Sequence, residues 1–206
     1  MGCPVGTADA ARDAVVNAAH EATLANVAVP KPHQSWSMYH HRLMGVMTAH
    51  GIVDATDALN AAVYTGLPLA VVCTSLDMES WGGKNMWGGD PGGDALPWQW
   101  FESPVTFPKW NVYWANVERG LVTNGCGPAQ LTSKGLQEMA NNRGGCWLPG
   151  PNMEVGAIFM QELINQCGNI QLAYQHYNGA GDAAVRYGEN AFALYTQWHA
   201  ELIAVR

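Results

Sequence analysis

The sequence has few charged residues, no run of one charge and no long apolar run. Lys, Arg, Asp and Glu make up 13% of the 206 residues, whereas hydrophobic residues make up 48%, a balance typical of a globular chain. No apolar stretch approaches the roughly 18 residues of a membrane-spanning helix. The formal net charge is −7 and basic clusters are absent, which argues against nucleic acid binding driven by electrostatics. We therefore expect a soluble globular protein without nucleic acid or membrane partners.

Signals for secretion and for metal binding are also absent. The N-terminal residues MGCPVGTADAARD contain neither the basic region nor the apolar region of an ordinary secretion signal, so we expect a protein made in the cytoplasm. The spacing of the histidines His33, His40, His41 and His50 matches no zinc motif. We expect neither a metal nor another cofactor.

Cysteine is scarce, with five residues and no C-x-x-C motif. Cys126 and Cys146 flank a short segment and could close a loop through a disulfide. Because disulfides are rare in proteins made in the cytoplasm, we favour free or buried thiols.

The chain divides near residue 35. Residues 8–25 are rich in alanine and favour a helix, and the segment Pro30-Lys31-Pro32 ends it. We interpret residues 1–35 as an N-terminal extension or a linker, and residues 36–206 as the folded domain.

Glu79 lies on the apolar face of a predicted helix that begins near Pro68. Val71 and Leu76 fall on the same side of this helix, whereas Asp77 faces the other way. A carboxyl group on an apolar face loses hydration, which raises its pKa and keeps a proton available near neutral pH. Glu79 is therefore a candidate general acid, although a glutamate at a helix end can also point into solvent.

Further helices are predicted from apolar spacing and capping residues. Thr132 or Ser133 caps one helix, and the strongly apolar helix after Asn152 should be central and buried. A short strand over 121–123 followed by Asn124-Gly125 predicts a β hairpin. The other expected helices cover residues 36–49, 58–64, a segment from Thr106 and Pro108 onwards, a segment ending at Gly179, and the C-terminus after Tyr187.

Residues 81–100, which we call the glycine-rich loop, combine six glycines with four tryptophans and two aspartates. A long loop of this composition is typical of a functional segment. Trp87 and its neighbours could offer flat faces to sugar rings, although most of the four tryptophans could also fill the core.

Three motifs occur in order along the chain. Glu79-Ser80 stands at a helix end, residues 127–132 read GPAQLT, and residues 173–181 read AYQHYNGAG. Their order resembles the lysozyme-like lytic transglycosylase and goose-type lysozyme superfamily, most of all the glycosidase domains of phage endolysins of the mycobacteriophage lysin A type. The resemblance covers roughly residues 36–206.

The resemblance implies an α+β fold that is mostly α: a lysozyme-like helical bundle with a small β hairpin beside the active-site cleft. It implies a monomer, or one part of a larger multidomain lysin, that cleaves the β-1,4 bond between MurNAc and GlcNAc in peptidoglycan after release from the host cytoplasm. Glu79 would be the general acid. The implied substrate-binding residues, beside Trp87, are Ser80, Gln130, Tyr177, Asn178 and Tyr187.

Two mechanisms stay open. Glu79 can act alone as acid and then as base, giving a 1,6-anhydro product, or Asp90 or Asp94 can activate water for hydrolysis. Both aspartates can equally stabilise turns; we lean slightly toward hydrolysis. The alternative functions are an inactive wall-binding or virion structural protein, and a chitin-degrading enzyme.

Overall fold

The computed structural model describes residues 38–90 and 92–205, and this part of the chain is mainly helical. The predicted extension over residues 1–35 lies outside the described residues. The α-helices are α2 (Met38–Ala49), α3 (Ala55–Thr65), α4 (Leu69–Ser80), α5 (Phe107–Glu118), α6 (Lys134–Asn142), α7 (Pro149–Cys167), α8 (Ile170–Asn178) and α9 (Asp182–Ile203), and a short 3-10 helix, η1, covers Trp98–Trp100.

Several helix ends lie where local signals predict them. The Ser133 hydroxyl caps α6 by accepting a hydrogen bond from the Leu136 N–H at 3.3 Å. Gly168 ends α7 in the left-handed conformation, which a residue without a β-carbon adopts at little cost. Two predicted boundaries are wrong: Asn152 lies inside α7 instead of capping it, and Tyr187 lies inside α9 instead of preceding it.

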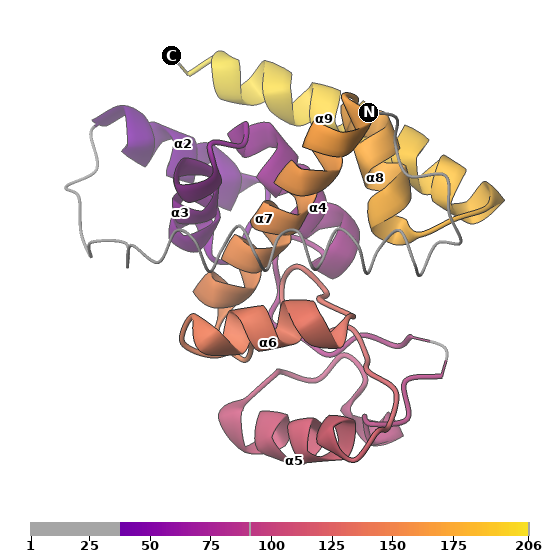
Figure 1. Cartoon of the computed structure of the whole chain (residues 1–206). Helices are drawn as coiled ribbons and strands as arrows, with labels where there is room; N and C mark the ends of the chain where they lie inside the picture. Colours follow the sequence, from indigo (N-terminus) through magenta and orange to yellow (C-terminus); the bar gives the residue numbers. More distant parts are fainter. Residues whose placement is uncertain (1–37, 91, 206) are drawn as a thin grey trace.

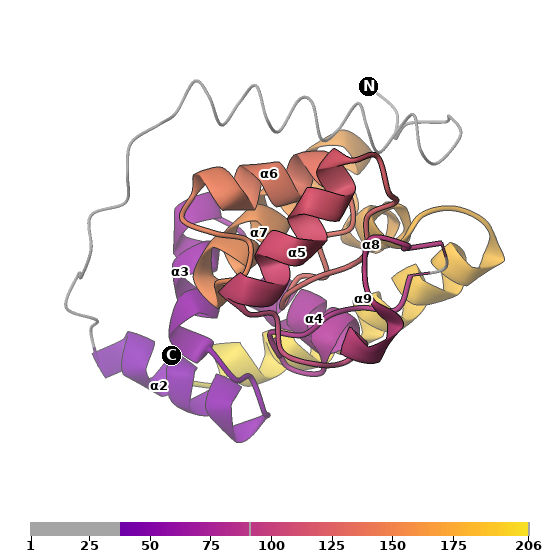
Figure 2. The ribbon, with the colours of Figure 1, turned by 90° about the horizontal axis from the view of Figure 1, so that it is seen from below.

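Helix α7 occupies the middle of the bundle, as its apolar sequence predicts. It contacts α3, α6 and α8, while α9 packs against both α4 and α8. Figure 1 shows α9 at one end of the molecule and α5 at the other, with α7 between them. Seen from below, α5 and α6 lie in front of α7, and α6 is the one that contacts it (Figure 2). The helices before and after the glycine-rich loop therefore form one bundle, and the loop joins α4 to α5.

The prediction of an α+β fold with a β hairpin is wrong. The described residues contain no β-strand; they form only isolated bridges, namely Met86 with Pro104, Trp87 with Cys126, and Cys126 with Leu131.

The predicted hairpin does not form, and three N–H groups of this segment bind side chains instead of a second strand. A strand is stabilised by a ladder of backbone hydrogen bonds to its neighbour. The N–H groups of Val122, Asn124 and Gly125 instead donate, in that order, to the carboxylate of Asp94, the hydroxyl of Tyr113 and the carboxylate of Asp90.

Helix α5 is held by an aromatic core. Trp87, from the glycine-rich loop, stacks on Trp110 with ring centroids 6.3 Å apart and meets Tyr113 at 4.8 Å. All three side chains are fully buried. The helical spacing of the aromatic residues Trp110, Tyr113 and Trp114 predicts that they belong to the core, and burial confirms this for Trp110 and Tyr113.

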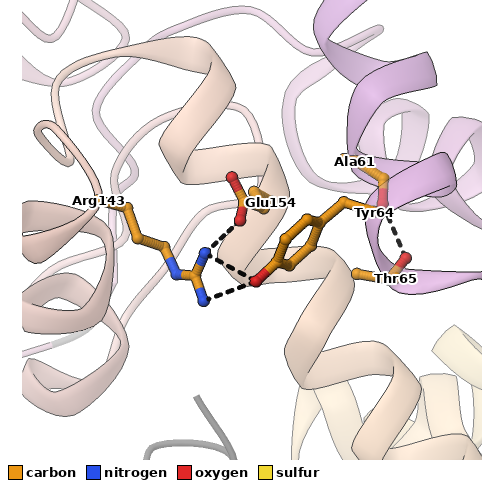
Figure 3. Close-up of polar contacts among 5 residues, drawn as sticks. All are labelled: Ala61, Tyr64, Thr65, Arg143 and Glu154. Atoms are coloured by element: carbon orange, nitrogen blue, oxygen red, sulfur yellow. Dashed lines mark hydrogen bonds and ion pairs between the residues drawn. The ribbon is translucent and has the colours of Figure 1, made fainter. Parts of the chain in front are cut away.

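A polar cluster joins α3 to the α6–α7 region (Figure 3). Arg143 forms an ion pair with Glu154, and the guanidinium also donates to the Tyr64 hydroxyl. Burial raises the pKa of Glu154, and the positive charge of Arg143 opposes that rise. Losing either charge would leave the other one desolvated and unpaired.

Within residues 38–90 and 92–205, none of the helices has the length and apolar character needed to cross a bilayer.

Candidate functional site

Glu79 occupies the last turn of α4, which ends at Ser80, and its side chain is partly exposed. The Tyr187 hydroxyl, from α9, donates a hydrogen bond to Glu79 Oε1. The two residues are 108 positions apart in the sequence, and the packing of α4 against α9 brings them together. The two predicted site residues Glu79 and Tyr187 are therefore in direct contact.

The Glu79 carboxylate interacts with two tyrosines, Tyr187 through a hydrogen bond and Tyr174 electrostatically. Burial raises the pKa of Tyr187 well above its usual value, and the negative charge of Glu79 raises it further. The pKa of Tyr174 is raised first by burial and, to a smaller extent, by the charges of Cys73 and Glu79. Both phenols therefore stay neutral around pH 7 and can donate hydrogen bonds. Tyr187 can thus orient the carboxylate without adding charge.

Ser80 does not face a ligand. Its side chain is buried, at 1% exposure, and its hydroxyl donates to the Pro128 carbonyl oxygen at 2.6 Å. This geometry corrects the predicted contact with substrate: Ser80 ties the end of α4 to residues 127–130, which we call the Gln130 turn.

Tyr177 has the same role from α8. Its side chain is buried at 7% exposure, and its hydroxyl donates to the Ala129 carbonyl oxygen at 2.7 Å. Asn178, the next residue, is the last residue of α8 and is exposed. These two adjacent residues therefore differ in role: Tyr177 holds the Gln130 turn, whereas Asn178 faces solvent.

Asn152 is the third residue that holds the Gln130 turn, and sequence reasoning missed this role. It is fully buried. Its Oδ1 accepts from the Ala129 N–H at 2.9 Å, and its Nδ2 donates to the Cys126 carbonyl at 3.0 Å and to the Cys146 carbonyl at 3.4 Å. An asparagine near a helix start is a typical cap, so the sequence carried no signal for a contact with a turn more than twenty residues away.

Gln130 is itself fixed by the backbone. It adopts a left-handed conformation, with φ of 46°, and its Nε2 donates to the carbonyls of Met86 at 3.1 Å and Gly127 at 2.8 Å. The absence of a side chain at Gly88 makes room for it, since a β-carbon there would lie 2.3 Å from Gln130 Oε1. The Gln130 amide therefore connects the glycine-rich loop to the Gln130 turn.

Asp90 and Asp94 are both exposed. The Asp90 carboxylate accepts from the Gly125 N–H, and the Asp94 carboxylate accepts from the Val122 N–H. Both contacts anchor the glycine-rich loop on residues 121–125. They correspond to the turn-stabilising role, and neither includes Glu79.

Trp87 is not available to a ligand, because its side chain is fully buried in the aromatic core. This placement corrects the prediction that Trp87 binds substrate. Its indole N–H lacks a hydrogen-bond partner among the described residues. The exposed tryptophans of the same loop are Trp81, at 60% exposure, and Trp98, at 84%.

The described residues contain no group of three or more His, Cys, Asp and Glu side chains able to hold a metal ion. Of the four histidines considered above, His33 lies outside the described residues, and His50 contacts Glu201 at 2.7 Å.

A comparison of the chain with protein-family models, curated proteins and solved structures finds no significant match in any of the three.

Proposed function

We propose that the protein is a peptidoglycan-cleaving glycosidase of the phage endolysin type, with Glu79 as its general acid. The observation that carries this proposal is the pairing of a partly exposed carboxyl group at a helix end with a neutral tyrosine hydroxyl from another helix. Such a pairing fixes the direction of the carboxyl group. A general acid must be held within hydrogen-bond reach of the leaving oxygen that it protonates.

The proposed reaction begins with proton transfer from the Glu79 carboxyl group to the oxygen of the bond between MurNAc and GlcNAc. The sugar then develops oxocarbenium character as this bond breaks. Tyr187 supports the step by holding one oxygen of the resulting carboxylate. The reaction can finish in two ways: the Glu79 carboxylate takes a proton from the muramic 6-hydroxyl, which closes a 1,6-anhydro ring, or water attacks the anomeric carbon.

The contacts of the two aspartates bear on this choice. A base that activates water needs a carboxylate about 6.5–9.5 Å from the acid, with water between them. The contacts of Asp90 and Asp94 with backbone N–H groups support a role in anchoring the loop instead. They favour Glu79 acting alone, in contrast to the slight preference for hydrolysis drawn from the sequence.

The first test compares Glu79→Gln with Glu189→Gln, a matched control that removes an exposed carboxylate from α9. Soluble muropeptides released from purified peptidoglycan are measured by mass spectrometry, and folding is checked by circular dichroism. We expect release by the wild type and by Glu189→Gln, and none by folded Glu79→Gln. Wild-type release by folded Glu79→Gln would refute the assignment.

The second test identifies the product. If Glu79 acts alone, wild-type muropeptides carry 1,6-anhydro ends, and Asp90→Asn and Asp94→Asn give the same products. Reducing-end products that disappear in one of these variants would instead assign that aspartate as the base for hydrolysis.

A wall-binding protein without activity is the second candidate, and the exposure of Trp81 and Trp98 favours it. Aromatic faces in solvent can stack on sugar rings without any chemistry. Sedimentation with purified peptidoglycan, without muropeptide release by the wild type, would support this alternative.

A further inference from the structure

The cysteines Cys126 and Cys146 form an isolated buried pair. Their sulfur atoms are 3.3 Å apart, and both side chains are fully buried. Cys126 directly precedes the Gln130 turn, and Cys146 lies in the connection between α6 and α7. The sulfur–sulfur distance in a disulfide is about 2.0 Å, so a small displacement separates the pair from a covalent bond.

The backbones beside the two sulfur atoms are already held together. The single Nδ2 of Asn152 donates to the carbonyls of both cysteines, at 3.0 Å and 3.4 Å. The same nitrogen lies 3.6 Å from the Cys146 sulfur. Because both chain segments are tied to one buried amide group, their approach does not depend on a chance orientation of two flexible side chains.

We propose that Cys126 and Cys146 form a disulfide when the protein leaves a reducing environment, and that this bond fixes the Gln130 turn to the α6–α7 connection. The inference does not depend on the proposed glycosidase activity. The described residues contain one further buried free thiol, Cys73, and no contact between it and this pair is seen.

The reaction needs a two-electron oxidant, for which a small-molecule disulfide such as oxidised glutathione suffices. The thiolate of one cysteine attacks the oxidant, forms a mixed disulfide and releases one thiol. The second thiolate then attacks the mixed disulfide, forms the Cys126–Cys146 bond and releases the second thiol. In balance, the two cysteines lose two protons and two electrons, and the oxidant becomes two thiols.

Burial makes this exchange slow in the folded protein. It raises the pKa of the Cys126 thiol well above its usual value, and the neighbouring Cys146 raises it further, so little thiolate is present at neutral pH. The small oxidant also has no direct access to the sulfur atoms. We therefore expect the bond to form during folding in an oxidising buffer, and to resist reduction once formed.

The test refolds the full chain in a glutathione redox buffer and then unfolds it in denaturant with iodoacetamide present, so that buried thiols are blocked as well. The protein is then digested with trypsin and Glu-C together. Cleavage after Lys134, Arg143 and Glu154 places Cys126 and Cys146 in separate peptides, and cleavage after Glu162 separates Cys167 from both. Mass spectrometry then identifies which cysteines are joined.

We expect the two peptides to be joined in the wild type and in Cys73→Ser, the matched control. We also expect the oxidised protein to have a midpoint of thermal unfolding (Tm) about 5–10 °C above that of the reduced protein, since the bond closes a loop of about 20 residues. Cys167 is also disulfide-bonded, so reduction opens that bond in every variant. The difference in Tm between oxidised and reduced protein should therefore be smaller in Cys146→Ala than in the wild type by about this amount. Recovery of Cys126 and Cys146 as alkylated thiols, or a bond from either of them to another cysteine, would overturn the proposal. Peptide mapping of the wild type decides the question even where Cys146→Ala does not fold.

Discussion

Replacing Asn152 with alanine should destabilise the protein, because its side chain holds the Gln130 turn. Asn152 is fully buried, and its Oδ1 is the hydrogen-bond acceptor of the Ala129 N–H. The substitution leaves this buried N–H without that acceptor and takes a donor from the carbonyls of Cys126 and Cys146. The Cys126 carbonyl keeps the Leu131 N–H as a partner at 3.1 Å, so the main losses are at Ala129 and Cys146.

The expected magnitude follows from these two losses. An unsatisfied buried polar group costs about 1–3 kcal/mol, and the small cavity left by the side chain adds to this cost. We expect the free energy of unfolding to fall by about 3–5 kcal/mol, and Tm to fall by roughly 10 °C for a chain of this size. Urea unfolding monitored by tryptophan fluorescence measures the first quantity, and calorimetry measures the second.

The matched control is Asn165→Ala in the same helix. Asn165 is exposed, and its Oδ1 accepts a hydrogen bond from the Gln161 Nε2 at 3.0 Å. Its removal should change stability by less than about 0.5 kcal/mol. A loss below about 1 kcal/mol for Asn152→Ala would refute the reasoning that this side chain holds the Gln130 turn.

Asn152→Asp gives a sharper version of the same test, because it keeps the shape and changes one donor into an acceptor. The new carboxyl group can hold the Ala129 N–H, but its second oxygen faces two carbonyl oxygens unless it is protonated. Its pKa in the folded protein should therefore lie above its unfolded value. The folded state then binds the proton more tightly, so stability relative to wild type is highest at low pH and falls as the pH rises through the folded pKa. A difference from wild type that stays constant between pH 4.5 and pH 8 would contradict this account.

Two further predictions concern Tyr187, which contacts Glu79 of α4, and Asp77 of the same helix. Tyr187→Phe removes the hydrogen bond to Glu79 and should lower muropeptide release about ten- to hundredfold, because the loss of one hydrogen bond to a charged group is worth about 1.5–3 kcal/mol. Tyr195→Phe on the same helix is the control, and equal release by both variants would contradict the role of Tyr187. Burial raises the pKa of Asp77, while the Trp198 indole N–H and His50 oppose the rise, so the charged form of Asp77 costs stability at neutral pH. Asp77→Asn should therefore stabilise the protein at pH 7, as measured by urea unfolding. This gain in stability should disappear as the pH falls through the raised pKa, because Asp77 is then neutral in the wild type as well.

The helices could be predicted from the sequence where a local signal ends them. Ser133 and Gly168 act within a few residues of their own position, so their effect does not depend on the rest of the fold. The absence of the β hairpin could not be predicted from a local signal. Asn124-Gly125 is a good hairpin signal by itself, but the N–H groups of this segment are taken by Asp90, Asp94 and Tyr113, and such contacts between distant segments are not visible in a local pattern.

Burial of the aromatic residues was equally hard to predict. Trp87 and Trp98 lie in the same glycine-rich loop, yet Trp87 is fully buried and Trp98 is 84% exposed. The difference comes from Trp110 and Tyr113 on α5, against which Trp87 packs. Composition identified the loop, whereas only the packing of α5 decided which ring enters the core.

Three of the site residues implied by the resemblance divide into two groups by what they contact. Ser80 and Tyr177 both donate to backbone carbonyls of the Gln130 turn, whereas Tyr187 donates to the Glu79 side chain. The first group fixes the backbone of the Gln130 turn, so substitutions there should lower stability and activity together. Tyr187 contacts the proposed acid itself, so its substitution should lower activity with little loss of stability. Comparing the two effects across Ser80→Ala, Tyr177→Phe and Tyr187→Phe therefore separates the framework of the proposed site from its chemistry.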